Sequence, residues 1–379
     1  MLIAGEASGD RLAAELVRAL RALPGGAGAR FFGAGGAEME RAGVELAFDL
    51  TQHSVIGFTE VLKHYGTFKR LFDRLLGLAL ERRPDLLVCV DFSGFNRRFA
   101  AVLRWELRVR AAALAGWRPR IVQFVSPQVW ASRPGRARSM ERDLDLLLAI
   151  FPFEKAWYAA HAPRLKVEFV GHPMLDRFGG VPAAVSGRAG SPLVLLLPGS
   201  RTGELRRHLP VMLPAAERVL REREVAVRLV VPSAALADQA RALAGPGTRI
   251  EIQVGGLPES LAEASLAIAS TGTVTMECAF FRVPTVTLYK TGWSTYQIGR
   301  RIITVKSLTM PNLLAGETVF PEFIQEAATA ENLAQAALEL LQDEARCAAI
   351  RAKLDGVLAS LGGPGATRRA AAAILSLPD

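Results

Sequence analysis

The sequence has few of the residues that build disulfide frameworks, zinc sites or membrane spans. Its three cysteines, Cys89, Cys278 and Cys347, are too scattered among 379 residues for a disulfide scaffold or a zinc site, and reduced thiols in a cytosol fit them best. No apolar run approaches the roughly 20 residues of a membrane-spanning helix. The start, MLIAGEASGD, lacks the basic segment and long apolar core of a secretion signal. A cytoplasmic protein, dissolved or attached to a membrane surface, is therefore expected.

Acidic residues are also in short supply. There are 37 Asp and Glu against 46 Lys and Arg, which gives a formal net charge of +9. This excess points to nucleic acid, phosphorylated small molecules or an anionic membrane surface as partners, and charge alone does not choose among them. A hydrophobic content of 50% supports a sizeable core, and the length of the chain favours two domains.

Short apolar runs alternate with longer helical patterns along the chain. This alternation predicts βα units and parallel sheets. The first run directly follows the initiator methionine, which fits a short strand or a chain that lacks a few upstream residues. The predicted strands lie at residues 2–4, 30–33, 86–90, 121–125, 146–150 and 167–170, and then at 193–197, 225–231, 249–254, 266–269 and 284–289.

Residues 176–190 separate the two groups of strands. They are rich in Gly, Ala, Pro and Ser and are typical of a linker. The predicted organisation is an N-terminal lobe over 1–175, a C-terminal lobe over 191–345 and a helical tail over 346–379 that packs back on the N-terminal lobe or on a partner subunit. Each lobe is expected to be a doubly wound α/β domain, with a cleft between the carboxyl ends of the two sets of strands.

The turn after residues 193–197 is a candidate anion site. Gly199 and Ser200 follow this apolar run, which places Arg201 at the carboxyl end of a buried strand. Such a turn can present backbone N–H groups and a guanidinium to a diphosphate. An ordinary strand-to-helix turn with a solvated arginine fits the same residues. Whether Glu204 contacts a ligand or orients Arg201 is open at this point.

A hydroxyl-rich turn follows the run 266–269. Thr271, Gly272 and Thr273 lie at the start of a helix, where the helix dipole and free N–H groups favour a phosphate. Glu277 lies one helical turn later on the same face and can reach a sugar diol. A chance pairing of Thr and Glu on a helix is the alternative.

The first lobe has a comparable turn after the run 86–90. Asp91 follows this run directly, and a glycine-containing turn leads from it to Asn96. An acid at the carboxyl end of a buried strand lies where chemistry occurs in this architecture, and the turn leaves room for a substrate hydroxyl. Helix capping by Asp91 or Asn96 is the alternative.

Other strand ends of the first lobe carry polar turns as well. The GEASGD turn at 5–10 can hold substrate oxygens on its N–H groups or can serve packing alone. In the turn 126–136, Trp130, Arg133 and Arg136 fit either a phosphate-binding rim or a proline-stiffened surface loop. The histidine of GHP at 171–173 fits a packing or hinge role and is kept near the cleft. The candidate residues on this side are Ser8, Gly9, Asp10, Asn96, Ser126, Gln128, Trp130, Arg133 and His172.

Two further segments mix apolar and polar residues. Segment 307–325, which contains Asn312, fits a ligand cleft or a packed connector. Between Phe58 and Leu76, apolar residues recur at helical spacing with basic residues between them. This pattern fits a core-facing stripe or an interfacial helix that meets acyl chains and anionic head groups. The residues of this candidate membrane contact are Phe58, Val61, Leu62, Tyr65, Phe68 and Phe72.

Taken together, these turns resemble one family. The motifs are AGEASGD at 4–10, DFSGFN at 91–96, SPQVWA at 126–131, PFEK at 152–155, GHP at 171–173, LLPGSR at 196–201, STGTVTMEC at 270–278 and MPNLLAG at 310–316. Their order over nearly the whole chain resembles that of the lipid-A-disaccharide synthases, which are inverting glycosyltransferases with two facing Rossmann-like lobes, the GT-B architecture. The chain departs from this pattern at Ser132, where the family usually has a second tryptophan.

The resemblance implies a reaction and its partners. It implies that a 2,3-diacylglucosamine unit passes from its UDP derivative to 2,3-diacylglucosamine 1-phosphate, with the acceptor in the first lobe and UDP in the second. No nucleic acid is implied, and the protein would act peripherally on the cytoplasmic face of the inner membrane, with a homodimer as one option.

The resemblance also suggests roles for residues. Asp91, Arg201 and Asn312 match positions regarded as important for activity, with Asp91 as the base. No cofactor is expected, and no metal, because the second-lobe turns carry no DxD-type acidic pair. The expected UDP-binding residues are Gly199, Ser200, Arg201, Thr271, Gly272, Thr273 and Glu277.

Competing interpretations remain at this level. Another GT-B enzyme, such as a UDP-N-acetylglucosamine 2-epimerase or a muropeptide glycosyltransferase, would share the nucleotide lobe and differ in the acceptor lobe. A basic, non-enzymatic binding protein is a third reading. Scattered arginines without a recognised binding module, and polar turns focused at strand ends, argue against that third reading.

Overall fold

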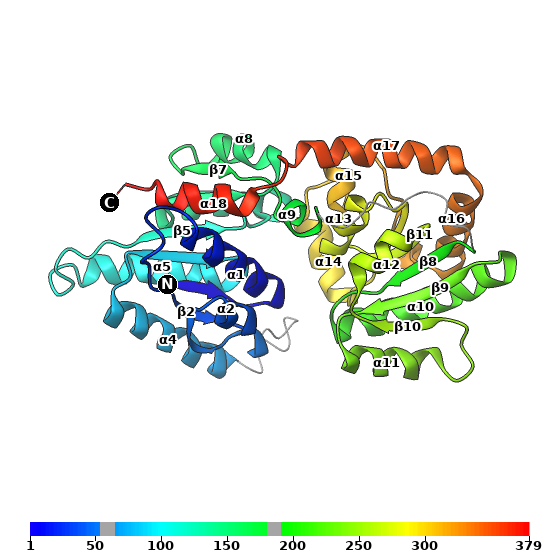
Figure 1. The fold of residues 1–379 in the computed structure, drawn as a ribbon, viewed down its shortest axis with the longest axis horizontal. Coiled ribbons are helices and arrows are strands. Elements are labelled where there is room, and N and C mark those ends of the chain that lie inside the picture. Colours follow the sequence, from blue (N-terminus) through cyan, green and yellow to red (C-terminus); the bar gives the residue numbers. More distant parts are fainter. Residues whose placement is uncertain (54–64, 180–190, 379) are drawn as a thin grey trace. The chain divides into compact units, whose positions relative to one another are not determined.

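The chain folds into two compact units, each built around one parallel sheet (Figure 1). The computed structural model describes residues 1–53, 65–179 and 191–378. The first unit contains Met1–Asp176 and Leu361–Asp379, and the second contains Arg177–Ser360. The chain therefore completes the second unit before it returns to the first.

The first unit has a seven-stranded sheet within the described residues, in the order β3-β2-β1-β4-β5-β6-β7. Its central strands are almost entirely buried apolar runs, which is typical of parallel strands covered on both faces. The sheet order reverses between β1 and β4, the point at which ligands bind in open α/β sheets. The strands are β1 (Leu2–Ala4), β2 (Phe32–Gly35), β3 (Glu45–Asp49), β4 (Leu86–Val90), β5 (Arg120–Phe124), β6 (Leu146–Ala149) and β7 (Val167–Phe169).

Helices connect these strands, and the last helix of the chain joins them. Leu12, Leu16 and Leu20 place the apolar face of α1 in the core, and α1 packs against α18. The carboxylate of Asp176 accepts hydrogen bonds from the backbone N–H groups of Gly365 and Thr367, which fixes the start of α18. The helices are α1 (Ala7–Arg21), α2 (Ala37–Arg41), α4 (Tyr65–Arg82), α5 (Ser93–Val109), α6 (Val129–Ser132), α7 (Arg136–Asp143), α8 (Pro152–His161), α9 (Met174–Phe178) and α18 (Ala366–Leu375).

The second unit has a six-stranded parallel sheet among the described residues, in the order β10-β9-β8-β11-β12-β13. Its order reverses between β8 and β11. The strands are β8 (Leu193–Leu197), β9 (Ala226–Val231), β10 (Glu251–Val254), β11 (Leu266–Ser270), β12 (Thr285–Tyr289) and β13 (Glu322–Ile324). The helices are α10 (Thr202–Glu222), α11 (Ala234–Ala244), α12 (Leu257–Glu263), α13 (Thr273–Phe280), α14 (Trp293–Ile302), α15 (Met310–Ala315), α16 (Ala330–Gln342) and α17 (Glu344–Ser360).

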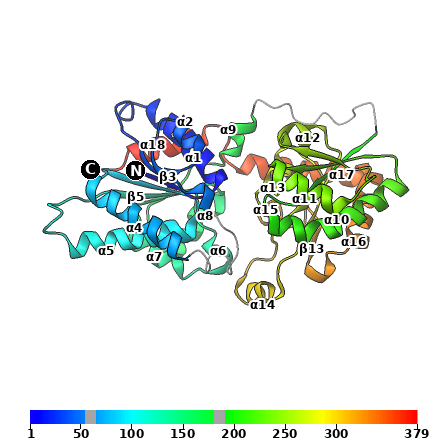
Figure 2. The same ribbon diagram turned by 90° about the horizontal axis from the view of Figure 1, so that it is seen from below.

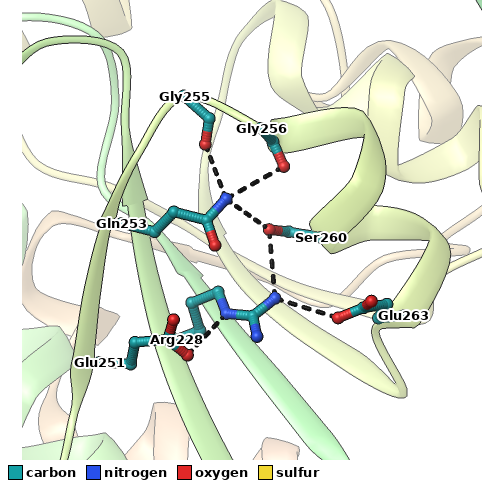
Figure 3. A network of polar contacts seen from close by, with 7 residues as sticks. All are labelled: Arg228, Glu251, Gln253, Gly255, Gly256, Ser260 and Glu263. Carbon is teal, nitrogen blue, oxygen red and sulfur yellow. Dashed lines mark hydrogen bonds and ion pairs between the residues drawn. The ribbon is translucent and has the colours of Figure 1, made fainter.

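A polar network stabilises one edge of the second sheet (Figure 3). The guanidinium of Arg228 on β9 bonds to Glu251 on β10 at 2.8 Å and to Glu263 on α12 at 3.1 Å. The side-chain amide of Gln253 donates to the carbonyl oxygens of Gly255 and Gly256, at 2.8 and 3.3 Å. The network thereby fixes the turn that leads from β10 into α12.

Two strands were not expected from the sequence. Strands β3 and β13 lie at sheet edges, and their side chains are half-buried or exposed. An edge strand needs no continuous apolar run, so both lack the pattern that identified the central strands. The two parallel sheets with their connecting helices confirm the predicted α/β fold. No helix in the described part of the chain is long and apolar enough to cross a membrane.

Candidate active site

The turn after β8 is held in shape by Glu204. One carboxylate oxygen of Glu204 accepts a hydrogen bond from the backbone N–H of Ser200 at 3.0 Å, and the other lies 3.8 Å from Nη1 of Arg201. Gly199 has a φ of 116°, and a Cβ there would lie 2.3 Å from the same carboxylate. Only glycine therefore fits under Glu204. Glu204 therefore braces the turn and lies beside Arg201, an arrangement that favours the orienting role among the two left open by the sequence.

The turn after β11 lies beside the turn after β8. The two strands are neighbours, and Leu197 is in register with Ala269, so both turns leave the same edge of the sheet where its order reverses. Gly272 has a φ of 145° and precedes α13, and no side chain caps the start of that helix. Thr273 is exposed there. Open N–H groups at a helix start, next to an arginine, suit an anion.

A buried histidine, which the sequence analysis missed, links this turn to β12. His208 on α10 is 1% exposed, its Nδ1 lies 2.7 Å from the carbonyl oxygen of Pro198, and its Nε2 accepts from the backbone N–H of Lys290 at 3.2 Å. A carbonyl acceptor on one side and an N–H donor on the other define a neutral ring protonated at Nδ1. Burial lowers the pKa of His208 accordingly. Its spacing of four residues from Glu204 was the available signal.

Lys290 and Gln325 continue the hydrogen-bond network that starts at His208. The ammonium of Lys290 donates to the carbonyl oxygens of Gln325 and Ala328, at 3.0 and 3.2 Å. The side chain of Gln325 exchanges hydrogen bonds with the backbone of Thr291 at 2.7 and 3.3 Å. The ends of β8, β12 and β13 are thus tied together through side chains.

The side-chain amide of Asn312, for which a catalytic role was expected, forms its hydrogen bonds within its own domain. It is 2% exposed, its Oδ1 accepts from the N–H groups of Val319 and Phe320, both at 2.8 Å, and its Nδ2 donates to Phe320 O and to Glu322, also at 2.8 Å. The amide is therefore fully used within its own domain. Glu322 also accepts from the backbone and hydroxyl of Thr309. These contacts correspond to the packed-connector interpretation of segment 307–325.

In the first unit, Asp91 lies at the end of β4 with an unusual backbone. Asp91 and Phe92 have φ angles of 48° and 43°, in the left-handed region that non-glycine residues seldom adopt. The carbonyl oxygen of Asp91 accepts from Asn96 Nδ2 at 2.9 Å and from Gln123 Nε2 at 3.2 Å, and its N–H donates to Phe124 O at 2.6 Å. Strained backbone of this kind persists only where its surroundings hold it, and it is common at active sites.

The GEASGD turn packs directly against Asp91 and Phe92. A Cβ on Gly9 would lie 3.6 Å from the Cβ of Asp91, and a Cβ on Gly5 would overlap the ring of Phe92. Ser8 is exposed beside them, whereas Asp10 is 4% exposed.

Several expected acceptor residues prove to be structural. The carboxylate of Asp10 accepts from three backbone N–H groups at the start of α2, and Asn96 is fully buried with its amide on the carbonyls of β1 and β4. Asp10 thus fixes the turn between β2 and α2, and Asn96 ties β1 to β4 at the switch point, so their hydrogen bonds favour a structural role over direct contact with substrate. The ring Nδ1 of buried His172 accepts from the backbone N–H of Met174, and the backbone N–H of His172 donates to Leu361 O. These bonds fit the hinge or packing role.

Trp130 lies in a buried cluster and not on an exposed rim. Its Nε1 donates to Glu154 at 3.1 Å, and the other oxygen of Glu154 accepts from the N–H groups of Ile150 and Phe151. Burial raises the pKa of Glu154 to about 7. Ser126 is also buried and lies 3.3 Å from the hydroxyl of Tyr158. This cluster fixes the turn, on which the side chains of Gln128 and Arg133 are exposed.

Three arginines gather near that turn, and none of them forms a salt bridge with another described residue. Arg97 on α5 and Arg136 on α7 are half-buried, and Arg133 is exposed. The pKa of Arg97 is lowered by burial and by Arg133, and that of Arg136 by burial, Arg97 and Arg133, so the three cations lie within electrostatic range of one another. Asp143 is the one nearby carboxylate that raises the pKa of Arg97, but it pairs with Arg142. Like charges held together in this way favour a bound anion.

The expected membrane helix lies partly outside the described residues, which leave out Phe58, Val61 and Leu62. The side chain of Tyr65 is likewise outside the description. Phe68 on α4 is half-buried. Phe72 packs edge-on against Phe95 and Phe99, both at 5.4 Å, so this residue faces its own domain.

Comparison with known proteins identifies the family. A family model described as lipid-A-disaccharide synthetase matches residues 1–375. The chain belongs to this family. It is 38% identical to the lipid-A-disaccharide synthase of Alkalilimnicola ehrlichii over 389 residues, which covers 99% of this chain and 97% of that protein. The enzyme of Geobacter sulfurreducens is 36% identical over 387 residues and is covered to 96%.

Solved structures of other proteins share the fold of this glycosyltransferase. MurG from Acinetobacter baumannii matches with a TM-score of 0.57 at 16% identity, over 100% of this chain and 99% of that one. The calicheamicin glycosyltransferase CalG4 matches with a TM-score of 0.59 at 16% identity, over 99% and 96%. At this identity the likeness concerns the fold alone, which is the GT-B architecture.

In residues 1–53, 65–179 and 191–378, no three His, Cys, Asp or Glu side chains come close enough to hold a metal ion. All three cysteines are buried as free thiols.

Proposed function

We propose that this member of the lipid-A-disaccharide synthase family transfers a 2,3-diacylglucosamine unit from its UDP derivative to 2,3-diacylglucosamine 1-phosphate. The products are the β-1,6-linked tetraacyl disaccharide 1-phosphate and UDP. One observation carries the proposal beyond family membership. The turn that carries Arg201 and the uncapped start of α13 follow adjacent strands and therefore lie side by side. This arrangement suits a nucleoside diphosphate.

The second unit would bind UDP and stabilise its departure. Arg201 and the N–H groups of Ser200 would meet the diphosphate, with Thr271, Gly272 and Thr273 on its other side. These groups are fixed before the reaction, by Glu204 and by the strand ends, so they need little reorganisation as negative charge develops on the leaving group. Glu277, one helical turn beyond Thr273, would bind the ribose hydroxyls.

The first unit would bind the acceptor, with Asp91 as the base that takes the proton of the attacking hydroxyl. A carboxylate with an ordinary pKa near 3.9 does not deprotonate a free alcohol beforehand, so proton transfer would accompany formation of the new C–O bond. Attack on the face opposite the leaving diphosphate inverts the anomeric carbon. Asn96 and Gln123 would act as positioning residues for Asp91.

The phosphate of the acceptor would lie among Arg97, Arg133 and Arg136. Arginine suits this task because its planar fork can donate two hydrogen bonds to one phosphate. Ser8 and Gln128, exposed on neighbouring turns, would contact the sugar. No metal is assigned, since Arg201 and the N–H groups would supply the positive charge. With these substrates, the enzyme would act peripherally on the cytoplasmic face of the inner membrane.

The decisive experiment supplies both substrates to the purified protein. Incubation with UDP-diacylglucosamine and diacylglucosamine 1-phosphate, followed by mass spectrometry, is expected to yield the tetraacyl disaccharide 1-phosphate and one equivalent of UDP. Turnover should be unchanged by EDTA. An epimerase would instead convert the UDP-sugar alone, and that result would contradict the proposal.

Substitution of Asp91 tests the assignment of the base. Asp91→Asn keeps the size of the side chain and the donors around its backbone but removes the basic oxygen. We expect kcat to fall by at least the roughly 100-fold typical of general-base loss, with UDP binding unchanged. Near-normal turnover at saturating acceptor would show that another group is the base.

A further inference from the structure

Helix α14 lies at the periphery of the second unit (Figure 2). Large apolar side chains of this helix and of the residue after it are exposed. The exposed fractions are 73% for Trp293, 61% for Ile298 and 41% for Ile303. Exposed apolar residues are ordinary when scattered singly, but these three lie within eleven residues of one another. Within the described residues, no other stretch of that length exposes as many large apolar side chains.

The same segment carries only positive charge. No Asp or Glu occurs between Glu277 and Glu317, whereas Arg300, Arg301 and Lys306 lie in or just after α14, all of them exposed. None of these three forms a salt bridge with a described residue. Arg300 instead lies over the ring of Tyr296, at 5.7 Å from its centroid. The cations therefore remain available to an external anion.

Apolar and basic side chains share one face of α14. At 100° per residue, Arg300, Trp293, Gln297, Arg301 and Ile298 fall in this order within an arc of roughly 160°. A face that alternates Trp and Ile with Arg is typical of helices that lie in a lipid headgroup region. There the apolar rings and chains enter the acyl boundary and the guanidinium groups meet phosphates.

Helix α5 provides a contrast. Trp105 and Val109 on α5 are also well exposed, at 53% and 62%. Two of the cations beside them are paired with carboxylates, Arg104 with Asp145 and Arg110 with Glu106, and the exposed Arg108 donates to the carbonyl oxygen of Arg104. Because most of its charge is neutralised, this apolar surface has less reason to prefer an anionic partner, and α5 serves as the control.

We propose that α14 and the residues up to Lys306 dock on the surface of an anionic lipid bilayer. The contact would hold the second unit at the membrane that carries both diacyl substrates, and in this respect it rests on the proposed function. It differs from the expected contact through residues 58–76, which belong to the first unit. Charge complementarity argues for this partner, because the segment is positive without any acid while anionic bilayers are uniformly negative at their surface.

Vesicle binding without substrate tests the proposal directly. The full-length protein is mixed with sedimentable vesicles of phosphatidylcholine containing either 0 or about 30% phosphatidylglycerol. Binding should require the anionic lipid and weaken with added salt. The Arg300→Gln/Arg301→Gln variant should bind about 30-fold more weakly, because each cation at such a surface contributes about fivefold. Trp293→Ala/Ile298→Ala should lose about tenfold or more.

The control variant is Trp105→Ala/Val109→Ala, which should bind vesicles like the unaltered protein. Equal loss in the control, or unchanged binding of both α14 variants, would overturn the proposal. So would a shift from dimer to monomer in the α14 variants by light scattering, since that would make α14 a contact between copies of this chain. All positions are exposed, and thermal unfolding should confirm that each variant folds.

Transfer assayed in detergent micelles separates this proposal from the proposed function. The α14 variants should keep the micellar rate of the unaltered protein and lose rate only with vesicle-embedded substrates. If vesicle binding requires α14 but the protein has no transferase activity, the proposed function is wrong and the docking proposal stands. If the protein is a fully active transferase but binds vesicles equally well without the α14 side chains, the docking proposal is wrong and the proposed function stands.

Discussion

The side-chain amide of Gln123 donates a hydrogen bond to the carbonyl oxygen of Asp91, across 3.2 Å between neighbouring strands β5 and β4. The same amide donates to Val125 O at 3.1 Å, and Gln123 is completely buried. Asp91 holds a left-handed φ of 48°, which costs about 1–3 kcal/mol for a non-glycine residue. Gln123 therefore helps to stabilise the strained backbone that orients the proposed base.

Replacing Gln123 by Met keeps its volume and removes both donors. We expect kcat to fall about tenfold, since one lost hydrogen bond is worth about 1 kcal/mol and Asn96 still holds Asp91. KM should change less than twofold, because Gln123 does not reach substrate. Steady-state kinetics and thermal unfolding measured together decide the matter. A lower unfolding midpoint with unchanged kcat would mean that Gln123 serves the fold alone.

The pair Arg201 and Glu204 gives a second prediction. Arg201→Ala removes the guanidinium proposed to stabilise the leaving diphosphate, and we expect kcat/KM to fall about 100-fold or more, the usual loss for a preorganised charged donor. Glu204→Gln keeps a possible acceptor for Ser200 N–H and weakens only the pairing with Arg201, so it should cost about tenfold or less.

Combining the two substitutions separates orientation from direct binding. If Glu204 acts through Arg201, adding Glu204→Gln to Arg201→Ala should change kcat/KM little further. Losses that multiply would indicate that Glu204 contacts the nucleotide itself. UDP affinity measured by calorimetry should follow the same pattern, while acceptor KM stays constant.

The sequence predicted the central strands and the turns at their ends, because parallel buried strands are apolar and stop abruptly at Gly and Pro. The sequence did not distinguish residues whose side chains line a site from residues whose side chains stabilise the turns around it. The carboxylate of Asp10 and the amide of Asn312 could bind a ligand by their chemistry, but they are already hydrogen-bonded to backbone groups of the protein. Those partners lie 26 and 8 residues away in sequence, so no local pattern could reveal them.

The residues that were not predicted left only weak signals in the sequence. Gln123 is the one polar residue in the run IVQFV, and a polar side chain in a buried strand requires a partner. Arg97 stood beside Asn96 in the sequence, but its proximity to Arg133 and Arg136 depends on how α5 and α7 pack. Such convergence across elements becomes visible only in three dimensions.

The arginine cluster predicts a specific defect in acceptor use. Arg97→Gln should raise KM for diacylglucosamine 1-phosphate about tenfold or more, because a charged hydrogen bond to phosphate is worth about 1.5–3 kcal/mol. KM for the UDP-sugar should not change. Arg98→Gln is the matched control, since Arg98 is exposed on the next position of α5. Equal effects of the two substitutions would point to general charge and not to a phosphate site.

Buried His208 predicts how stability depends on pH. Burial lowers its pKa from the ordinary value of 6.5, so the folded protein keeps the ring neutral while the unfolded chain takes up a proton below that value. Its contribution to the free energy of unfolding is therefore fully present above pH 6.5. That contribution is lost progressively as pH falls from the ordinary pKa toward the lowered one.

His208→Gln is the informative variant, because glutamine can donate to Pro198 O and accept from Lys290 N–H without a titrating group. Between pH 8 and about 5.5, denaturant titrations should show a larger loss of stability in the unaltered protein than in the variant. His208→Ala, which leaves both partners unsatisfied, should be less stable than either at every pH, by about 1–3 kcal/mol. Parallel pH profiles for the unaltered protein and His208→Gln would show that His208 is not the group whose protonation opposes folding.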